Sequence, residues 1–75
     1  MSLETTIMDN HLAQQLLISQ RNEITEHHIC RRLAKSLKSD QNREIMEKIA
    51  DDELRHYQDW KAYTQQEVKP DRFKI

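Results

Sequence analysis

Two side chains that could bind a metal ion, Glu53 and His56, form a Glu-x-x-His motif. On a helix, residues three apart lie one turn apart on the same face, so this carboxylate and this imidazole can reach one ion. Glu23 lies thirty residues upstream, and Glu26 follows it by one turn. Carboxylate oxygen and imidazole nitrogen together suit divalent first-row metals such as iron, zinc and manganese. We therefore predict that Glu23, Glu53, His56 and Glu26 are metal ligands.

Helical wheels, drawn at about 100° per residue, place Glu23 and Glu53 at the centres of two apolar stripes. The apolar residues within about 40° are Leu12, Leu16, Cys30, Ala34 and Leu37 around Glu23, and Met46, Ile49, Tyr57 and Trp60 around Glu53. Burying an unpaired carboxylate is costly, and a bound cation offsets that cost. Cys30, on the same stripe, is expected to be a small buried hydrophobic residue.

The composition predicts an all-α protein, because the chain has no glycine, one proline and 33% charged residues rich in helix formers. We expect one domain, a hairpin of two antiparallel helices over about 6–37 and 41–66, followed by an extended tail at 67–75. Ser39 or Asp40 is expected to cap the second helix. If the chain reverses there, Glu23 lies level with His56, and Glu26 lies level with Glu53.

A chain of 75 residues buries only about 60% of its unfolded surface, and chains of this size often depend on a metal ion, a disulfide or a partner. Cys30 is the only cysteine, which excludes a disulfide within the chain. We predict a homodimer that closes a four-helix bundle around the polar layer. A second apolar strip, formed by Ala13, Leu17 and Ile24, lies about 80–120° from Glu23 and predicts a higher homo-oligomer.

Two segments, RNEITEHHICRRLAKSL and REIMEKIADDELRHYQDWKAYT, resemble the first two helices of a rubrerythrin-type ferritin-like domain. The resemblance spans about residues 20–75 and is greatest to the variety found ahead of vacuolar iron transporter-type membrane domains. The thirty-residue spacing also resembles encapsulated ferritins, whose subunits are helical hairpins that build their iron site across a dimer. A complete rubrerythrin domain has four helices, so the chain is expected to be either half of such a domain or a self-assembling hairpin.

The resemblance implies a carboxylate-bridged di-iron site that oxidises ferrous iron with dioxygen or peroxide, in iron storage, transport or detoxification. It implies that Glu23, Glu53 and His56 bind iron, with Glu53 bridging, and that Glu26 is a further ligand or a gate for incoming metal. His27 and Tyr57 are expected beside these ligands, and His28 at the surface. A membrane transporter domain or a protein shell is the partner that the resemblance suggests.

Two other interpretations remain open. The polar layer could only set the register of a structural dimerisation module, as buried polar groups do in coiled coils, or it could hold zinc or manganese without redox turnover. The net charge of −1, with interspersed signs, favours no nucleic acid and no anionic membrane as a partner. No apolar run approaches the length of a membrane-spanning helix and no signal peptide is apparent, so a cytoplasmic protein is expected.

Overall fold

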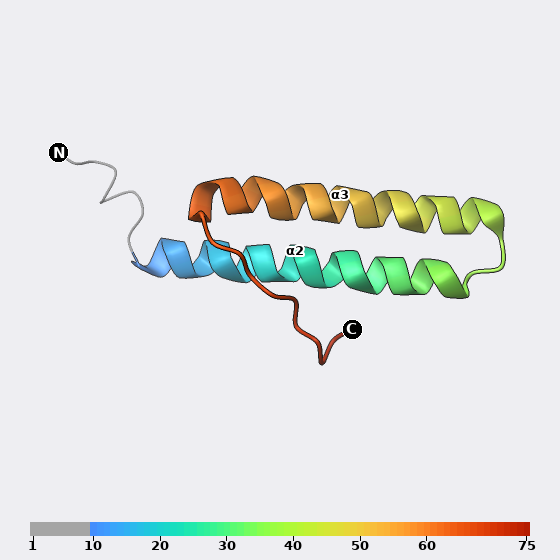
Figure 1. Cartoon of the computed structure of the whole chain (residues 1–75), viewed down its shortest axis with the longest axis horizontal. Helices are drawn as coiled ribbons and strands as arrows, with labels where there is room; N and C mark the ends of the chain where they lie inside the picture. Colours follow the sequence, from blue (N-terminus) through green and yellow to red (C-terminus); the bar gives the residue numbers. More distant parts are fainter. Residues whose placement is uncertain (1–9) are drawn as a thin grey trace.

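The computed structural model describes residues 10–75, and two long helices lie side by side in it as an antiparallel hairpin (Figure 1). Helix α2 comprises Asn10–Ser36 and helix α3 comprises Asp40–Thr64. No strand occurs among the described residues, which confirms the all-α expectation. The predicted start of the first helix, near residue 6, lies outside the described residues. Neither described helix has a stretch long and apolar enough to cross a membrane.

A three-residue connection reverses the chain, and polar side chains satisfy the backbone groups around it. Ser39 is the N-cap of α3, and its hydroxyl accepts a hydrogen bond from the backbone N–H of Asn42 at 3.3 Å. Arg43 donates to the carboxylate of Asp40 at 2.9 Å and to the carbonyl oxygen of Leu37 at 3.2 Å. These bonds tie the end of α2 to the first turn of α3.

Helix α3 ends because Gln65 adopts a left-handed backbone conformation, with φ 56° and ψ 29°. Its N–H donates to the carbonyl oxygen of Lys61 at 2.7 Å, which satisfies one of the free carbonyls at the helix end. The expected end, near residue 66, therefore falls two residues later than the observed one at Thr64. Beyond it the tail leaves the helix and crosses α2 (Figure 1).

The tail is attached to the hairpin through polar groups that are fully or nearly buried. The Gln20 side chain, which has no exposed surface, donates to the carbonyl oxygen of Gln66 at 2.6 Å and accepts from the Thr64 hydroxyl at 2.6 Å. Farther along, the Thr25 hydroxyl accepts from the N–H of Asp71 at 2.8 Å. Buried polar groups without such partners would be destabilising, so these bonds fix the path of the tail.

The strip expected to contact another subunit is partly occupied by the chain's own tail. Ala13, Leu17 and Ile24 are each half-buried in the single chain. Residues 66–69 of the tail line the same groove as Leu17 and Ile18. The strip is therefore not a free apolar surface, and the need for a further subunit there is smaller than the sequence suggests.

The helices meet through small residues, and a side of the hairpin is left open. Cys30, Ala34 and Ala50 are the buried apolar residues among those described. Large apolar side chains remain 42–68% exposed on what we call the open face, formed by Leu33, Ile45, Ile49 and Tyr63. On the helical wheels all four lie at negative angles from Glu23 or Glu53. In an antiparallel pair, angles of the same sign on the two helices point to the same side of the hairpin, so these four side chains share one face.

Candidate metal centre

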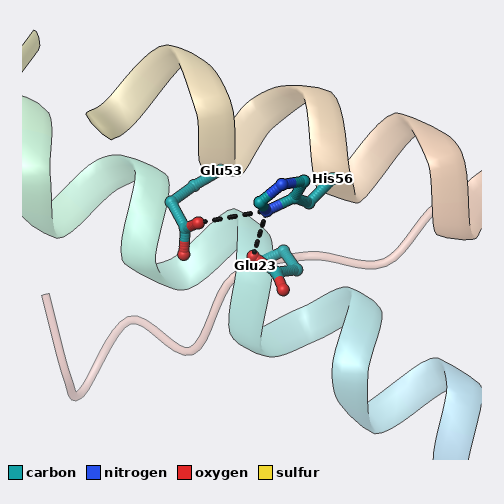
Figure 2. Close-up of side chains that lie close together, drawn as sticks. All are labelled: Glu23, Glu53 and His56. Atoms are coloured by element: carbon teal, nitrogen blue, oxygen red, sulfur yellow. Dashed lines mark hydrogen bonds and ion pairs between the residues drawn. The ribbon is translucent and has the colours of Figure 1, made fainter. Parts of the chain in front are cut away.

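Glu23, Glu53 and His56 converge between the two helices (Figure 2). Helix α3 contributes Glu53 and His56 from successive turns, and α2 contributes Glu23. One oxygen of each carboxylate and one ring nitrogen of His56 all lie within 4.8 Å of one another. Three donors at this separation are close enough for small side-chain rotations to bring them around a single ion.

The imidazole links the two carboxylates. The Nδ1 atom of His56 lies 3.2 Å from Oε1 of Glu53, to which it can donate, and 3.5 Å from Oε2 of Glu23. The contact across the hairpin confirms that Glu23 and His56 lie level, as the position of the turn predicted. A metal ion bound by Nδ1 would replace the proton that this atom shares with the carboxylates.

The electrostatic balance of the cluster raises the pKa of Glu23. Partial burial is the largest cause, followed by the hydrogen bond and charge repulsion of the Glu53 carboxyl group, while His56 acts in the opposite direction. The side chains of Glu23 and Glu53 are 24% and 23% exposed, and that of His56 is 47% exposed. Two carboxylates held this close favour either a shared proton or a bound cation.

The single hairpin does not enclose the cluster, in which Glu23 and Glu53 are half-buried and His56 is exposed. On α3, the fully buried Ala50 lies about 60° around the helix from Glu53, and its carbonyl oxygen contacts His27 of α2. On α2, the buried Cys30 and Ala34 lie within about 20° of Glu23. Glu53 is therefore displaced toward the open face, while Glu23 stays near the centre of its stripe.

The remaining candidate residues have other positions or partners. Glu26 is exposed and lies outside the cluster of three. His27 donates from Nδ1 to the carbonyl oxygen of Ala50 at 2.7 Å, which joins α2 to α3. The hydroxyl of Tyr57 accepts from the N–H of Val68 at 3.2 Å. His27 and Tyr57 thus bond to the backbone, and a role beside a metal stays a prediction for both.

His28 and Cys30 have the environments expected of them. His28 is exposed as a whole. The partial loss of water around its ring, followed by the charges of His27 and Arg72, lowers its pKa. Cys30 is buried, and burial, with the nearby Glu26 and Glu53 carboxylates, raises the pKa of its thiol. A thiol in such surroundings is a poor nucleophile and a poor metal ligand.

The helical wheel placed Trp60 on the stripe around Glu53, but the sequence did not predict Asp59 and Ala62 beside the cluster. An open groove beside it is lined by Glu23 and His56 together with Asp59, Trp60, Ala62 and Tyr63. The rings of Trp60 and Tyr63 lie 6.4 Å apart at an interplanar angle of 52°. The buried Gln20 was also missed, because a glutamine on a charged helix carries no sign of burial until the path of the tail is known.

Compared with known proteins, the chain matches no family model, no curated protein and no solved structure. The fold and the geometry of the cluster therefore carry the functional argument.

Proposed function

We propose that two copies of this hairpin pack through their open faces into a ferritin-like four-helix bundle that binds a pair of iron ions. The observation that carries the proposal is the position of the Glu23, Glu53 and His56 donors, within 4.8 Å of one another at the edge of an exposed apolar face. A second copy related by a two-fold axis would cover that face and supply an equal set of donors.

The donor set fits the metal. Di-iron bundles use one Glu from each of two helices and one Glu-x-x-His motif from each of the other two, which is the set that two copies of Glu23, Glu53 and His56 would provide. When bound, iron would supply the redox chemistry that oxidises ferrous iron with dioxygen or peroxide, in storage, transport or detoxification in the cytoplasm. Glu26, exposed one turn from Glu23, would be a further ligand or would attract incoming cations at the rim.

The chain's own residues would prepare the site in three ways. Glu53 and His56 are set one turn apart on a rigid helix, so their spacing is fixed before metal arrives. The Nδ1 atom of His56 already faces both carboxylates, so it would bind the same ion when the ring carries its proton on Nε2. Trp60 and Tyr63, beside the cluster, would limit the access of water once a second copy covers them.

A second candidate function has its own support. Without metal, the Nδ1 atom of His56 already interacts with both carboxylates, so the cluster partly satisfies itself. Such a layer could set the register of a structural dimer, as buried polar groups do in coiled coils. A zinc or manganese ion without redox turnover would fit the same donors.

The test is a titration with ferrous iron under anaerobic conditions, in which native mass spectrometry counts the bound ions. The loaded protein is then exposed to air. We expect about two irons per dimer and a rising ferric absorbance, both lost in Glu53→Ala. Glu47→Ala, which removes an exposed carboxylate from the same helix, is the matched control and should bind iron normally.

Other outcomes separate the candidates. A dimer that takes up no iron, zinc or manganese would overturn the metal-binding proposal and leave the register-setting module. Uptake of zinc or manganese without any ferric signal from iron would point to the non-redox site.

A further inference from the structure

The second half of α2 carries a row of basic residues on the side away from the candidate metal centre. His28, Arg31, Arg32 and Lys35 are spaced three, four and seven residues from the first, so they share one face of the helix. All four are exposed. Like charges one turn apart on a helix repel one another, so an anion bound across them would stabilise this segment.

The tail turns this row into a groove. Arg72 of the tail faces the row and lines the same concave surface, with Pro70 and Ile75 forming its apolar part. No carboxylate side chain is among the residues that line it. The groove therefore brings together three guanidinium groups, one ammonium group and one imidazole.

No side-chain carboxylate pairs with these cations. Within residues 10–75, Arg31, Lys35 and Arg72 form no ion pair, and Arg32 donates one N–H to the backbone oxygen of Ile75, the last residue of the sequence, at 3.0 Å. The adjacent carboxylate in the sequence, Asp71, accepts a hydrogen bond from the N–H of Phe73 at 3.0 Å and does not line the groove. The carboxyl group of Ile75 is thus the one acidic group among the residues that line the groove, and the basic side chains outnumber it.

The groove is formed before any ligand arrives, because the tail is held in place by its own hydrogen bonds. The N–H of Asp71 donates to the nearly buried hydroxyl of Thr25, which in turn donates to the carbonyl oxygen of Arg21 at 2.7 Å. Arg72 follows directly, so its position relative to α2 is defined. A ligand would not have to order the tail, a cost that weakens binding to flexible segments.

We infer that this groove binds a phosphate group. Arginine guanidinium groups match the oxygens of phosphate in pairs, and several of them converging on one anion give stronger and more selective binding than isolated lysines. The phosphate can be free or can belong to a lipid headgroup. Phe73, fully exposed between Arg72 and Lys74, would suit the boundary of a bilayer in the second case.

The net charge of −1 concealed this feature. It averages the acidic residues that are abundant on α3 with the basic residues that α2 and the tail bring together. The sequence-based expectation, which favoured no nucleic acid and no anionic membrane as a partner, depended on that average and on the interspersed signs. It does not describe this side of the folded chain.

The test is a titration of the full chain with inorganic phosphate at constant ionic strength, in which NMR spectroscopy monitors the backbone amide chemical shifts. We expect saturable shifts around Arg31 and Arg72, and an affinity at least about tenfold weaker in the double variant Arg31→Gln/Arg72→Gln. The matched control, Lys48→Gln/Arg55→Gln, removes the same charge from α3 and should bind as the wild type does.

A parallel measurement with vesicles separates the two sources of phosphate. Binding to phosphatidic acid vesicles that weakens in Phe73→Ala, with no saturable effect of free phosphate, would assign the lipid headgroup. Saturation by free phosphate without vesicle binding would assign the free anion.

Equal shifts with chloride, or equal loss of binding in both double variants, would overturn the inference, since either result means simple charge screening. Glu53→Ala should bind phosphate normally. The outcome is therefore independent of iron binding.

Discussion

The two sides of the hairpin differ in what covers them. The side along which the tail runs, here called the tail face, is held by hydrogen bonds: Gln20 donates to Gln66, while Thr25 and Tyr57 accept from backbone N–H groups of the tail. The open face instead leaves Leu33, Ile45, Ile49 and Tyr63 exposed beside the Glu23, Glu53 and His56 cluster. One surface is partly covered within a single chain, and the other presents apolar side chains and charged groups without cover from the described residues.

The difference shows how a short chain can divide its sources of stability. On the tail face, specific polar contacts determine the position of the last eleven residues. On the open face, the apolar area that would stabilise a two-helix protein is still accessible to water. Since hydrophobic burial is the main favourable contribution to folding, the open face is where a second copy would add most.

The largest expected effect comes from removing the buried amide of Gln20 on the tail face. We expect Gln20→Ala to lower the free energy of unfolding by about 2–3 kcal/mol, because it leaves a cavity and deprives the carbonyl of Gln66 of its donor. Urea denaturation followed by circular dichroism measures the change. The control Gln58→Ala, an exposed glutamine on α3, should change the free energy of unfolding by less than about 0.5 kcal/mol. Equal effects would mean that the tail contributes no specific stability.

A second variant pair compares the faces directly. Ile45 on the open face and Ile18 beside the tail are both 52% exposed, so any difference between their variants reflects location. If two copies bury the rest of Ile45, Ile45→Gln should weaken the dimer by about 2 kcal/mol, or about thirtyfold, since each dimer loses two side chains. Sedimentation equilibrium measures this, and Ile18→Gln should leave the dimerisation constant unchanged. A monomeric wild type, or equal weakening by both variants, would exclude the open face as the interface.

The smallest expected effect concerns the charge of the cluster without metal. Because the folded state raises the pKa of Glu23, it binds that proton more tightly than the unfolded chain does. The stabilisation is fully present below the ordinary value of 4.5 and is lost as pH rises through the raised pKa. In the presence of a metal chelator, the melting temperature of the wild type should therefore fall relative to that of Glu23→Gln as pH rises across that range. Parallel curves would show that Glu23 does not interact with its neighbours as described.

Much of the fold could be predicted from local sequence signals. Ser39 was identified as a candidate cap, because its hydroxyl can satisfy free N–H groups at the start of α3. The position of the turn then placed Glu23 level with His56, since both helices rise by the same amount per residue. The end of α3 was less predictable, because Gln65 adopts a left-handed conformation that glutamine rarely favours and that the anchored tail maintains.

Helical periodicity and one turn are enough to predict two amphipathic helices and to place Glu23 level with His56. These properties are local. The tertiary structure shows in addition that Ala50 is buried against α2, which leaves Glu53 toward an open edge. It also decided that the tail brings Arg72 to the basic row of α2. Both depend on contacts between distant residues, and periodicity within one helix carries no information about which side of its stripe a partner will occupy.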